Sequence, residues 1–504
     1  MKEIELKLTV DDSFELPVLE PAATGVTAVR EHPPADLRAT YFDTADLRLA
    51  RSGITLRHRT GEDERNGWTL KLPVDGANGK GAAVREEHFF PGRKTAPPPE
   101  AVDLVTAYVR GSSLLPVAKI QTQRRRWALT GEGGDELAEL ASDEVSVLDK
   151  RRKVVLFREL ELEARTLDRN GLDRIAGELT KAGAAVSDPA PKLVRVLGQQ
   201  AAAPPDLVPS GAPGPKAPAG EAVRSSLVAG TARLVANDPG TRLGQVEPLH
   251  QMRVALRRLR SNIRTFGPLI EQGGAEDVVP ELRWLGRALG AVRDQDVLLE
   301  RLRASAAELE ADLAPLFESL EESRRAKHSE LLDALSSKRY GRLIDTLTEA
   351  ALAPPLTESA DRPCGEVLPP LAKKAWKKLA KRVEATPPTA PAEDLHEVRI
   401  HVKRVRYAAE TVEPSLRGKK AKGARGFAAK AAALQDVLGA NQDTVVARRA
   451  TAQAAGRRAG DPAFLAAATT LFERQQELAI EYRHRYPEVW RKLDRPKRTK
   501  WMRM

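Results

Sequence analysis

The chain has 504 residues, 81 of them Lys or Arg and 70 of them Asp or Glu, and its net charge is +11. This length is too great for one compact core and favours two or three domains. The single cysteine, Cys364, excludes an intramolecular disulfide framework and a multi-cysteine zinc site. Because the sequence starts without a signal-peptide pattern and has no apolar run long enough to cross a bilayer, we expect a cytoplasmic protein without membrane insertion.

Before residue 200 the hydrophobic pattern mostly has a period of two. Charged and apolar side chains alternate over residues 3–8 and 157–163, and less cleanly over residues 54–59, as is typical of half-buried strands. Glycines separate these runs, and residues 167–182 have the pattern of a helix. We therefore expect an antiparallel sheet with a few helices.

The charged faces of these strands carry both signs, with acids concentrated near the two ends of the domain. The residues concerned are Glu3, Glu5 and Lys7; Arg57, Arg59, Arg85, Arg124 and Arg126; and Glu159, Glu161 and Glu163. A charged face is usually the solvated side of a strand. If the sheet instead closes into a barrel, the acids meet the cations in an ionic interior. Such an interior suits Mg²⁺ or Mn²⁺ held by carboxylates and phosphoryl groups held by cations.

Residues 201–220 are dense in proline, alanine and glycine, a composition that blocks helices and central strands. We expect an extended linker between a first domain, residues 1–200, and a second domain, residues 221–495, which a basic tail follows at residues 496–504. The first 200 residues contain 30 Lys and Arg against 32 Asp and Glu, so the remaining residues carry 51 against 38. The basic excess lies after residue 200, where it favours a polyanionic partner over a merely solubilising surface.

After the linker the period becomes three to four, which predicts an all-helical domain containing an internal repeat. A histidine begins each copy, and three cations follow at offsets of 3, 7 and 10, on one stripe of a helix. The two copies are His250, Arg253, Arg257 and Arg260, and His396, Arg399, Lys403 and Arg406. A Leu-Gly pair and an aspartate follow about forty residues later in each copy, at 289–294 and 438–443.

A basic stripe is often only a solvated helix face, but like charges at these spacings repel one another, and a bound anion relieves the repulsion. Only 22 Phe, Trp and Tyr occur in the whole chain, whereas proteins that bind single-stranded nucleic acid use aromatic stacking platforms. The pattern thus favours a phosphate chain without bases over nucleic acid.

The ordered motifs of residues 1–200 resemble the CYTH family, also called triphosphate tunnel metalloenzymes. The motifs are Glu3-x-Glu5-x-Lys7, Tyr41-Phe-Asp-Thr44, Leu56-Arg-His-Arg59, Trp68-Thr-Leu-Lys71, Arg85-Glu-Glu87 and Glu159-Leu-Glu-Leu-Glu163. The resemblance implies an eight-stranded antiparallel tunnel, Mg²⁺ or Mn²⁺ as cofactor, and the activity of an inorganic triphosphatase, a thiamine triphosphatase or a class IV adenylate cyclase.

The same resemblance implies roles for single residues. Metal ligands are expected among Glu3, Glu5, Asp143, Glu159, Glu161 and Glu163. Triphosphate contacts are expected from Lys7, Arg57, Arg59, Lys71, Arg85, Arg124, Arg126 and Lys192, with the register at 124–126 left open. Lys7, Glu5 and Glu161 are the expected catalytic residues.

The duplicated helices resemble a CHAD domain over residues 221–495, with repeats at about 221–350 and 365–495. That resemblance implies two pseudo-symmetric helical bundles with a basic surface for polyphosphate. The expected contacts are the eight residues of the two stripes, while Arg293 of the first repeat has Gln442 at its matching position.

The sequence therefore predicts an α+β chain: an eight-stranded antiparallel β tunnel followed by a duplicated all-α domain. We expect metal-dependent hydrolysis of inorganic triphosphate in the tunnel and binding of inorganic polyphosphate by the helices, with association with polyphosphate granules as one option. The alternatives are a polyphosphate-binding scaffold without turnover, an adenylate cyclase, and a nucleic-acid-binding protein.

Overall fold

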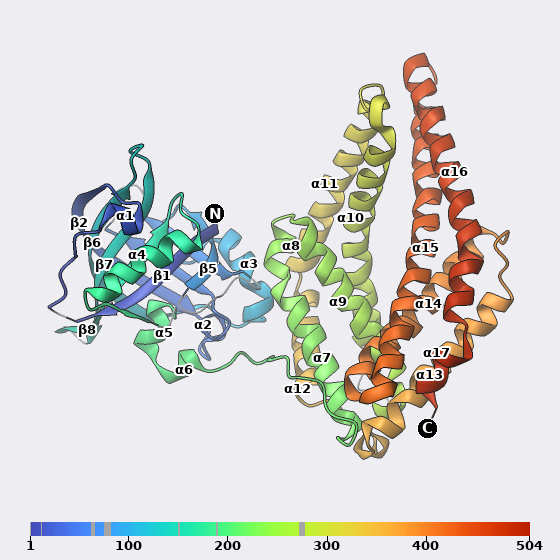
Figure 1. The fold of residues 1–504 in the computed structure, drawn as a ribbon, viewed down its shortest axis with the longest axis horizontal. Helices are drawn as coiled ribbons and strands as arrows, with labels where there is room; N and C mark the ends of the chain where they lie inside the picture. The colour runs from blue at the N-terminus through green and yellow to red at the C-terminus, as the bar shows by residue number, and fades with distance from the viewer. Residues whose placement is uncertain are drawn as a thin grey trace. The chain divides into compact units, whose positions relative to one another are not determined.

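The chain of the computed structural model forms two compact units, residues 1–206 and residues 207–504. The structure describes residues 2–11, 13–61, 66–74, 82–149, 152–187, 190–271 and 278–503. Figure 1 shows strands in the first unit and helices throughout the second.

An antiparallel sheet closed into a ring forms the body of the first unit. Its strands are β1 (Lys2–Val10), β2 (Ala28–Asp43), β3 (Thr55–Thr60), β4 (Gly67–Pro73), β5 (Ala82–Phe90), β6 (Leu115–Thr130), β7 (Glu136–Asp149), β8 (Arg152–Ala164) and β9 (Ala185–Val186). Their order is β5-β4-β3-β2-β6-β7-β8-β1, and β1 also pairs with β5, so eight strands close on themselves. The short strand β9 adds to β1. This confirms the predicted eight-stranded ring.

The hydrophobic core of this unit lies outside the ring, under helices. Leu160 and Leu162 of β8 are buried with Leu172 and Ile175 of α4 (Arg169–Lys181). On another part of the ring, α3 (Pro99–Val109) covers an apolar cluster that contains Trp68. Because side chains alternate along a strand, an outer face that is apolar leaves the inner face to the charged residues.

One mouth of the ring is closed by a short helix, α5 (Lys192–Leu197). Leu193 of α5 is buried against Tyr41 of β2, Ile120 of β6 and Val145 of β7. Val145 shares its strand face with Asp143, which lies inside the ring, so α5 enters the opening. This placement brings Lys192, the first residue of α5, to the interior.

The segment that follows α5 is fixed to the same unit. Helix α6 (Gln199–Ala202) is followed by Asp206, whose carboxylate accepts a hydrogen bond from Arg51 Nη2 at 2.6 Å and another from Arg110. The Arg51 guanidinium also donates to the carbonyl of Pro204 at 2.8 Å. We call this contact of Arg51 and Arg110 with Asp206 the Asp206 clamp.

The second unit is built from helices, and no strand occurs in its described ranges, 207–271 and 278–503. This agrees with the predicted all-α domain. Its α-helices are α7 (Ala219–Ala236), α8 (Asp238–Arg242), α9 (Val246–Thr265), α10 (Val278–Ala306), α11 (Ala314–Ser336), α12 (Lys338–Leu352), α13 (Cys364–Glu384), α14 (Ala392–Val412), α15 (Gly418–Arg457), α16 (Pro462–Leu493) and α17 (Pro496–Thr499).

The two repeats are joined along their long helices. Helices α10 and α11 form one antiparallel pair, and α15 and α16 form the corresponding pair (Figure 1). Leu302 of α10, Phe317 of α11 and Phe464 of α16 are buried in one shared cluster. Helices α9 and α14, which carry the two predicted stripes, pack against each other. No helix in the described part of the chain combines the length and apolar character that a bilayer span requires.

We expect the substitution Leu162→Ala to destabilise the first unit by about 2–5 kcal/mol, because Leu162 is fully buried under α4 and its removal leaves a cavity. The exposed Leu156 of the same strand is the matched control, and L156A is expected to cost less than about 0.5 kcal/mol. Hydrogen exchange of the β7 and β8 amides in the full-length protein measures the loss of stability in both variants. Equal effects would mean that the outer face is not the core.

Candidate functional site

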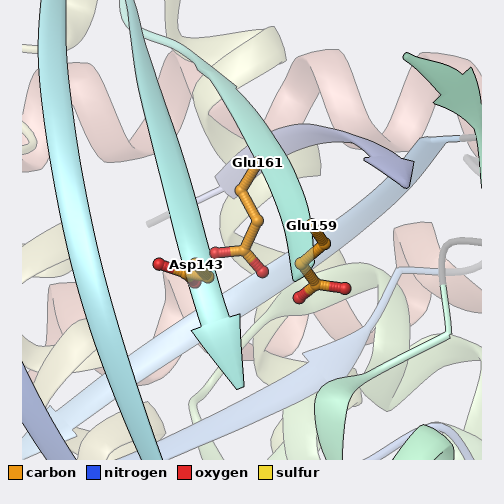
Figure 2. A group of neighbouring side chains, drawn as sticks. All are labelled: Asp143, Glu159 and Glu161. Atoms are coloured by element: carbon orange, nitrogen blue, oxygen red, sulfur yellow. The ribbon is translucent and has the colours of Figure 1, made fainter. Parts of the chain in front are cut away.

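Three carboxylates meet inside the ring. Asp143 comes from β7, and Glu159 and Glu161 come from β8, where they share one strand face (Figure 2). One oxygen of each lies within 4.8 Å of the others. Asp143 and Glu159 are fully buried, and the nearby Glu5 of β1 is 7% exposed. Since carboxylates repel one another at this spacing, the cluster needs cations.

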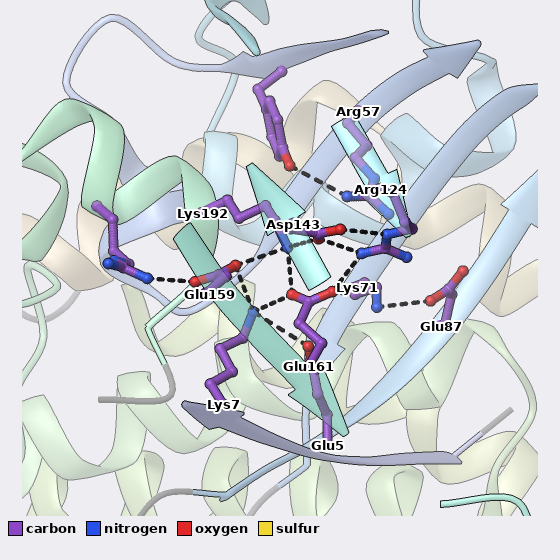
Figure 3. A network of polar contacts seen from close by, with 12 residues as sticks. Glu5, Lys7, Arg57, Lys71, Glu87, Arg124, Asp143, Glu159, Glu161 and Lys192 are labelled. Carbon is purple, nitrogen blue, oxygen red and sulfur yellow. Dashed lines mark hydrogen bonds and ion pairs between the residues drawn. The ribbon is translucent and has the colours of Figure 1, made fainter. Parts of the chain in front are cut away.

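Lysine and arginine side chains of the protein supply those cations (Figure 3). Lys7 Nζ donates to Glu161 Oε1 at 2.5 Å and lies 3.2 Å from Glu5 Oε1. Lys192 Nζ lies 2.8 Å from both Asp143 Oδ2 and Glu159 Oε1, and it also contacts Glu161. Arg124 donates to both oxygens of Asp143, at 2.7 and 2.6 Å, and to Glu161 Oε2 at 2.5 Å. Asp143 and Glu161 thus each contact two or more cations.

These contacts decide which groups stay charged. Burial raises the pKa of Glu161, but Lys192, Lys7 and Arg124 outweigh burial and hold that pKa well below its usual range. Burial lowers the pKa of Lys192, yet the surrounding carboxylates raise it well above its ordinary value. Burial raises the pKa of Glu5, and repulsion from Glu161 raises it further. Among these carboxylates, Glu5 is therefore the one whose charge most needs another cation.

A second group of cations lies on β3 and β4. Lys71 Nζ is 2.9 Å from Glu87 Oε2 of β5, and Arg57 Nη1 donates to the Tyr41 hydroxyl at 3.2 Å. Burial raises the pKa of Glu87, but Lys71, Arg57 and Arg59 lower it to about 2. Figure 3 shows Arg57, Lys71 and Glu87 beside the acidic cluster. The basic groups therefore stand next to the acids, and Lys7, Arg124 and Lys192 stand among them.

The structure also places the remaining predicted tunnel residues. Arg124 contacts the acids, and Arg126 shares its strand face, whereas Arg125 pairs with Glu31. Arg85 of β5 is in register with Glu3 of β1, but the Glu3 side chain lies outside the described residues, and so does its predicted role as a metal ligand.

Glu163 shares the face of Glu159 and Glu161, but its Oε1 accepts from Arg165 Nη1 at 2.7 Å instead of meeting Lys7 or Lys192. Arg195, which was not among the predicted site residues, donates to Glu159. Its spacing of three residues from Lys192 on one short helix was the available signal.

The chemistry of the donors fits a hard divalent cation. Mg²⁺ and Mn²⁺ prefer carboxylate oxygens, and Mg²⁺ usually takes one or two carboxylates together with phosphate oxygens. Asp143, Glu159 and Glu161 offer such oxygens within 4.8 Å of one another. Glu159 Oε1 is buried and makes no hydrogen bond to the described residues, although Lys192 lies near it.

In the second unit the two predicted stripes form one basic surface, because the helices α9 and α14 that carry them pack against each other. Arg253 and Arg257 of α9 and Arg399 of α14 act electrostatically on Lys403 of α14: burial lowers the pKa of Lys403 to about 7, aided by these three arginines. Burial and the same kind of repulsion lower the pKa of Arg257. Among the described residues, Arg257, Arg399 and Lys403 have no carboxylate within ion-pair distance. We call this surface the stripe groove.

The first arginine of each stripe lies against a glycine of a neighbouring helix. Arg253 lies over Gly290, donates to its carbonyl at 3.2 Å, and pairs with Asp294 at 2.7 Å. A Cβ built on Gly290 would lie 3.7 Å from the Arg253 guanidinium, and one built on Gly439 would lie 3.5 Å from that of Arg399. Both distances are ordinary van der Waals contacts, so the first arginine of each stripe lies directly against the neighbouring helix at the Leu-Gly element of its repeat.

The ends of the stripes differ. Arg406 donates to Glu410 at 2.7 Å, and Arg260 is surrounded by further arginines whose charges, after burial, lower its pKa. These are Arg264, Arg283, Arg287 and Arg404. The sequence analysis did not find them, because the first three lie outside the repeated spacing and Arg404 is one position out of register. His250 lies near Arg293, and His396 lies near Gln442, so the two histidines occupy matching places.

Comparison with known proteins assigns both units. The CYTH domain matches residues 1–195, and the CHAD domain matches residues 226–452. The chain is a fusion of a CYTH domain and a CHAD domain. The CYTH family includes triphosphatases and cyclases, and its tunnel enzymes depend on metal. We call residues 1–206 the CYTH unit and residues 207–504 the CHAD unit.

Similar proteins cover either the whole chain or one unit. The "Uncharacterized protein MT2285" of Mycobacterium tuberculosis is 33% identical over 98% of this chain and 96% of its own length. PptA from Streptomyces chartreusis is 24% identical, with a TM-score of 0.46, over 54% of this chain and 99% of its own. The CHAD domain from the plant Ricinus communis is 28% identical, with a TM-score of 0.45, over 55% and 95%.

We expect Lys403→Met to stabilise the CHAD unit in the absence of an anion. The pKa of Lys403 is about 7 in the fold and near 10.5 when unfolded, so its charge opposes folding fully below pH 7. This cost decreases as the pH rises from about 7 to 10.5 and vanishes above that window. At pH 6 the melting temperature should rise by about 2–4 °C for each kcal/mol of repulsion removed.

The check is thermal unfolding of both proteins in the same buffers between pH 6 and pH 10, since the difference between them cancels all other titrations. The gain should decrease steadily with increasing pH. A gain that is independent of pH would show that the extra stability comes from packing and not from charge.

Proposed function

We propose that the CYTH unit hydrolyses inorganic triphosphate and that the CHAD unit binds inorganic polyphosphate. The observation that carries the first part is the closed ring with Asp143, Glu159 and Glu161 inside it and Arg57, Lys71 and Arg124 beside them. A compact polyanion with several phosphoryl groups matches an interior in which carboxylates and cations alternate over short distances.

The basic residues bind and orient the substrate. Arg57, Arg59 and Lys71 lie near Glu87. A bound triphosphate can replace that single carboxylate as the anionic partner of the three cations. Arg124 and Lys192 lie within the acidic cluster, where we expect them to contact the phosphoryl group that is transferred. Cations fixed in advance stabilise the charge that develops when water attacks the terminal phosphorus and diphosphate leaves.

The acidic residues hold the cofactor. Glu5, Asp143, Glu159 and Glu161 would bind Mg²⁺ or Mn²⁺, which when bound neutralises phosphate oxygens and activates water. Lys7 bridges Glu5 and Glu161 and keeps the two carboxylates together. The helix α5 closes one mouth of the ring and thereby limits the access of bulk water to the interior.

The proposal for the CHAD unit rests on the stripe groove. Among the described residues, Arg257, Arg399 and Lys403 have no carboxylate within ion-pair distance, although Asp443 acts on Lys403 and Arg399 from further away. Burial, together with repulsion from the arginines, lowers the pKa of Lys403 to about 7. A phosphate chain in the groove would relieve this repulsion and return the lysine to its charged form. Joined to the CYTH unit in one chain, the groove would raise the local concentration of phosphate polymer near the tunnel.

We expect Glu161→Gln to lower the kcat for phosphate release from triphosphate by about 10²–10³, because Glu161 contacts Lys7, Arg124 and Lys192 and belongs to the acidic cluster. Polyphosphate binding by the full-length protein should not change. Release of phosphate with Mg²⁺ and with Mn²⁺ is the measurement.

The control is Glu144→Gln, which removes a charge from the opposite face of β7, one residue from Asp143. It should keep nearly full activity. Unchanged turnover in Glu161→Gln would remove the proposed active site, and an equal loss in both variants would point to the fold instead.

We expect Arg257→Gln to weaken polyphosphate binding and to reduce the slope of log affinity against log salt by about 1, since one phosphate contact is lost. The exposed Arg325 of α11 gives the matched control, and Arg325→Gln should leave affinity and slope unchanged. Titrations at several salt concentrations test both variants. A slope that Arg257→Gln leaves unchanged would contradict the role of the stripe groove.

A further inference from the structure

Three segments of the CHAD unit contain Lys and Arg but no Asp or Glu. They are residues 367–383 in α13, 414–435 leading into α15, and 496–503 at the C-terminal end, and together they hold sixteen basic residues. Eleven of these are lysines, and none of the eleven is within ion-pair distance of a carboxylate in the part of the chain that the structure describes. We call these three segments the tail platform.

Aromatic contacts bring the three segments together. Trp501 of the final turn, which is 3% exposed, packs edge-on against Phe427 of α15 with ring centroids 5.9 Å apart. Phe427 packs against Trp376 of α13 at 5.3 Å, and Trp376 stacks on Trp490 of α16 at 5.4 Å. Figure 1 shows α13 and α17 together near the C-terminus. The sequence analysis predicted only a basic tail here, whereas residues 496–502 form α17 and a 3-10 turn.

This arrangement has electrostatic and conformational costs. Lys419 and Lys420 lie in the first turn of α15, where the helix dipole disfavours cations. Gly423 and Gly426 interrupt the same helix at about 1 kcal/mol each relative to alanine. A Cβ at these positions would lie 3.3 Å from Trp501 and 3.1 Å from Arg498, so a larger residue would require these side chains to shift by a few tenths of an ångström. These lysines and glycines therefore weaken the first turns of α15, which is where the basic C-terminal tail packs against it.

A path of further cations connects the tail platform with the stripe groove around α14. Arg260 at the end of the first stripe is influenced by Arg404, and Arg404 acts in turn on His401. His401 is also influenced by Arg382 and Lys378 of α13. The helices that carry these cations pack on one another, α13 on α14 and α14 on α9. Two carboxylates also lie along the path, since Glu397 acts on His401 and Asp394 pairs with Arg382.

The residue composition of the tail platform limits the classes of ligand that it can bind. None of the large hydrophobic residues that are exposed in the described structure belongs to the tail platform, so it offers neither a wedge for lipid nor a platform for bases. Such a surface recognises phosphate charge alone. A stiff duplex with a persistence length of about 150 base pairs would not follow the cations around a single helix, whereas a flexible chain does.

We propose that one long chain of inorganic polyphosphate occupies the stripe groove and the tail platform together, along the path around α14. This rests on the proposed function of the CHAD unit and adds a preference for chain length. One stripe spans about 15 Å, ten residues at 1.5 Å each, so a short chain fills the groove and only a longer chain reaches the platform. Chains that engage both surfaces gain avidity.

The test compares Lys497→Glu/Lys500→Glu with the matched double variant Arg325→Glu/Lys338→Glu in the full-length protein. Both change the net charge equally, and all four side chains are exposed. The probes are inorganic polyphosphate cut to about 15 Å, long-chain polyphosphate, and duplex DNA. The tail variant should bind the long chain at least about tenfold more weakly and the short chain equally well, and the control should bind both as before.

The outcomes separate this inference from the function on which it rests. If Arg257→Gln weakens both chains while the tail variant binds the long chain normally, the tail platform plays no part and the inference is wrong. If Arg257→Gln weakens neither, the proposed function of the groove itself fails. If the tail variant loses affinity for duplex DNA but not for long polyphosphate, the platform is a nucleic-acid surface and the inference is overturned.

Discussion

The CYTH unit depends on keeping buried carboxylates charged. Asp143 and Glu159 are fully buried, and Lys192 lies 2.8 Å from both. Burial raises the pKa of Asp143, but Arg124 and Lys192 outweigh burial and lower that pKa. A closed ring allows this arrangement, because its alternating strands send leucines outward to the helices and charges inward to one another. A buried ion pair contributes little to stability by itself, so the network is better understood as a preformed set of charges for a ligand.

The pairing of charges in the CHAD unit differs from that in the CYTH unit. Inside the ring the cations are matched by acids, whereas in the stripe groove Arg257 and Lys403 remain largely unmatched, and the burial of leucines and alanines on the other faces of α9 and α14 holds them in place. Arg253 and Arg399 lie against Gly290 and Gly439 of the adjacent helices. A phosphate ligand would therefore replace existing carboxylate partners of the cations in the CYTH unit. In the CHAD unit it would instead relieve the repulsion between neighbouring cations.

Much of this could be predicted from the sequence because it follows from periodicity. Strict alternation in Glu159-Leu-Glu-Leu-Glu163 fixes a shared face, and offsets of 3, 7 and 10 fix a helical stripe. Contacts that depend on distant partners were not predictable. The choice of Arg124 as the residue that meets Asp143 follows from the register of β6 with β7, and the pairing of Glu163 with Arg165 follows from side-chain reach. Arg283 and Arg287 join Arg260 only because α10 packs on α9.

The Asp206 clamp has a consequence for the boundaries of the CYTH unit. The family match ends at residue 195, inside the helix α5 that brings Lys192 to the interior, yet Arg51 and Arg110 hold the chain eleven residues further on. A fragment cut at the family boundary would leave two guanidinium groups without their carboxylate and free the mouth-closing helix at its C-terminal end. The smallest autonomous form of the tunnel therefore includes the beginning of what the sequence presents as a spacer.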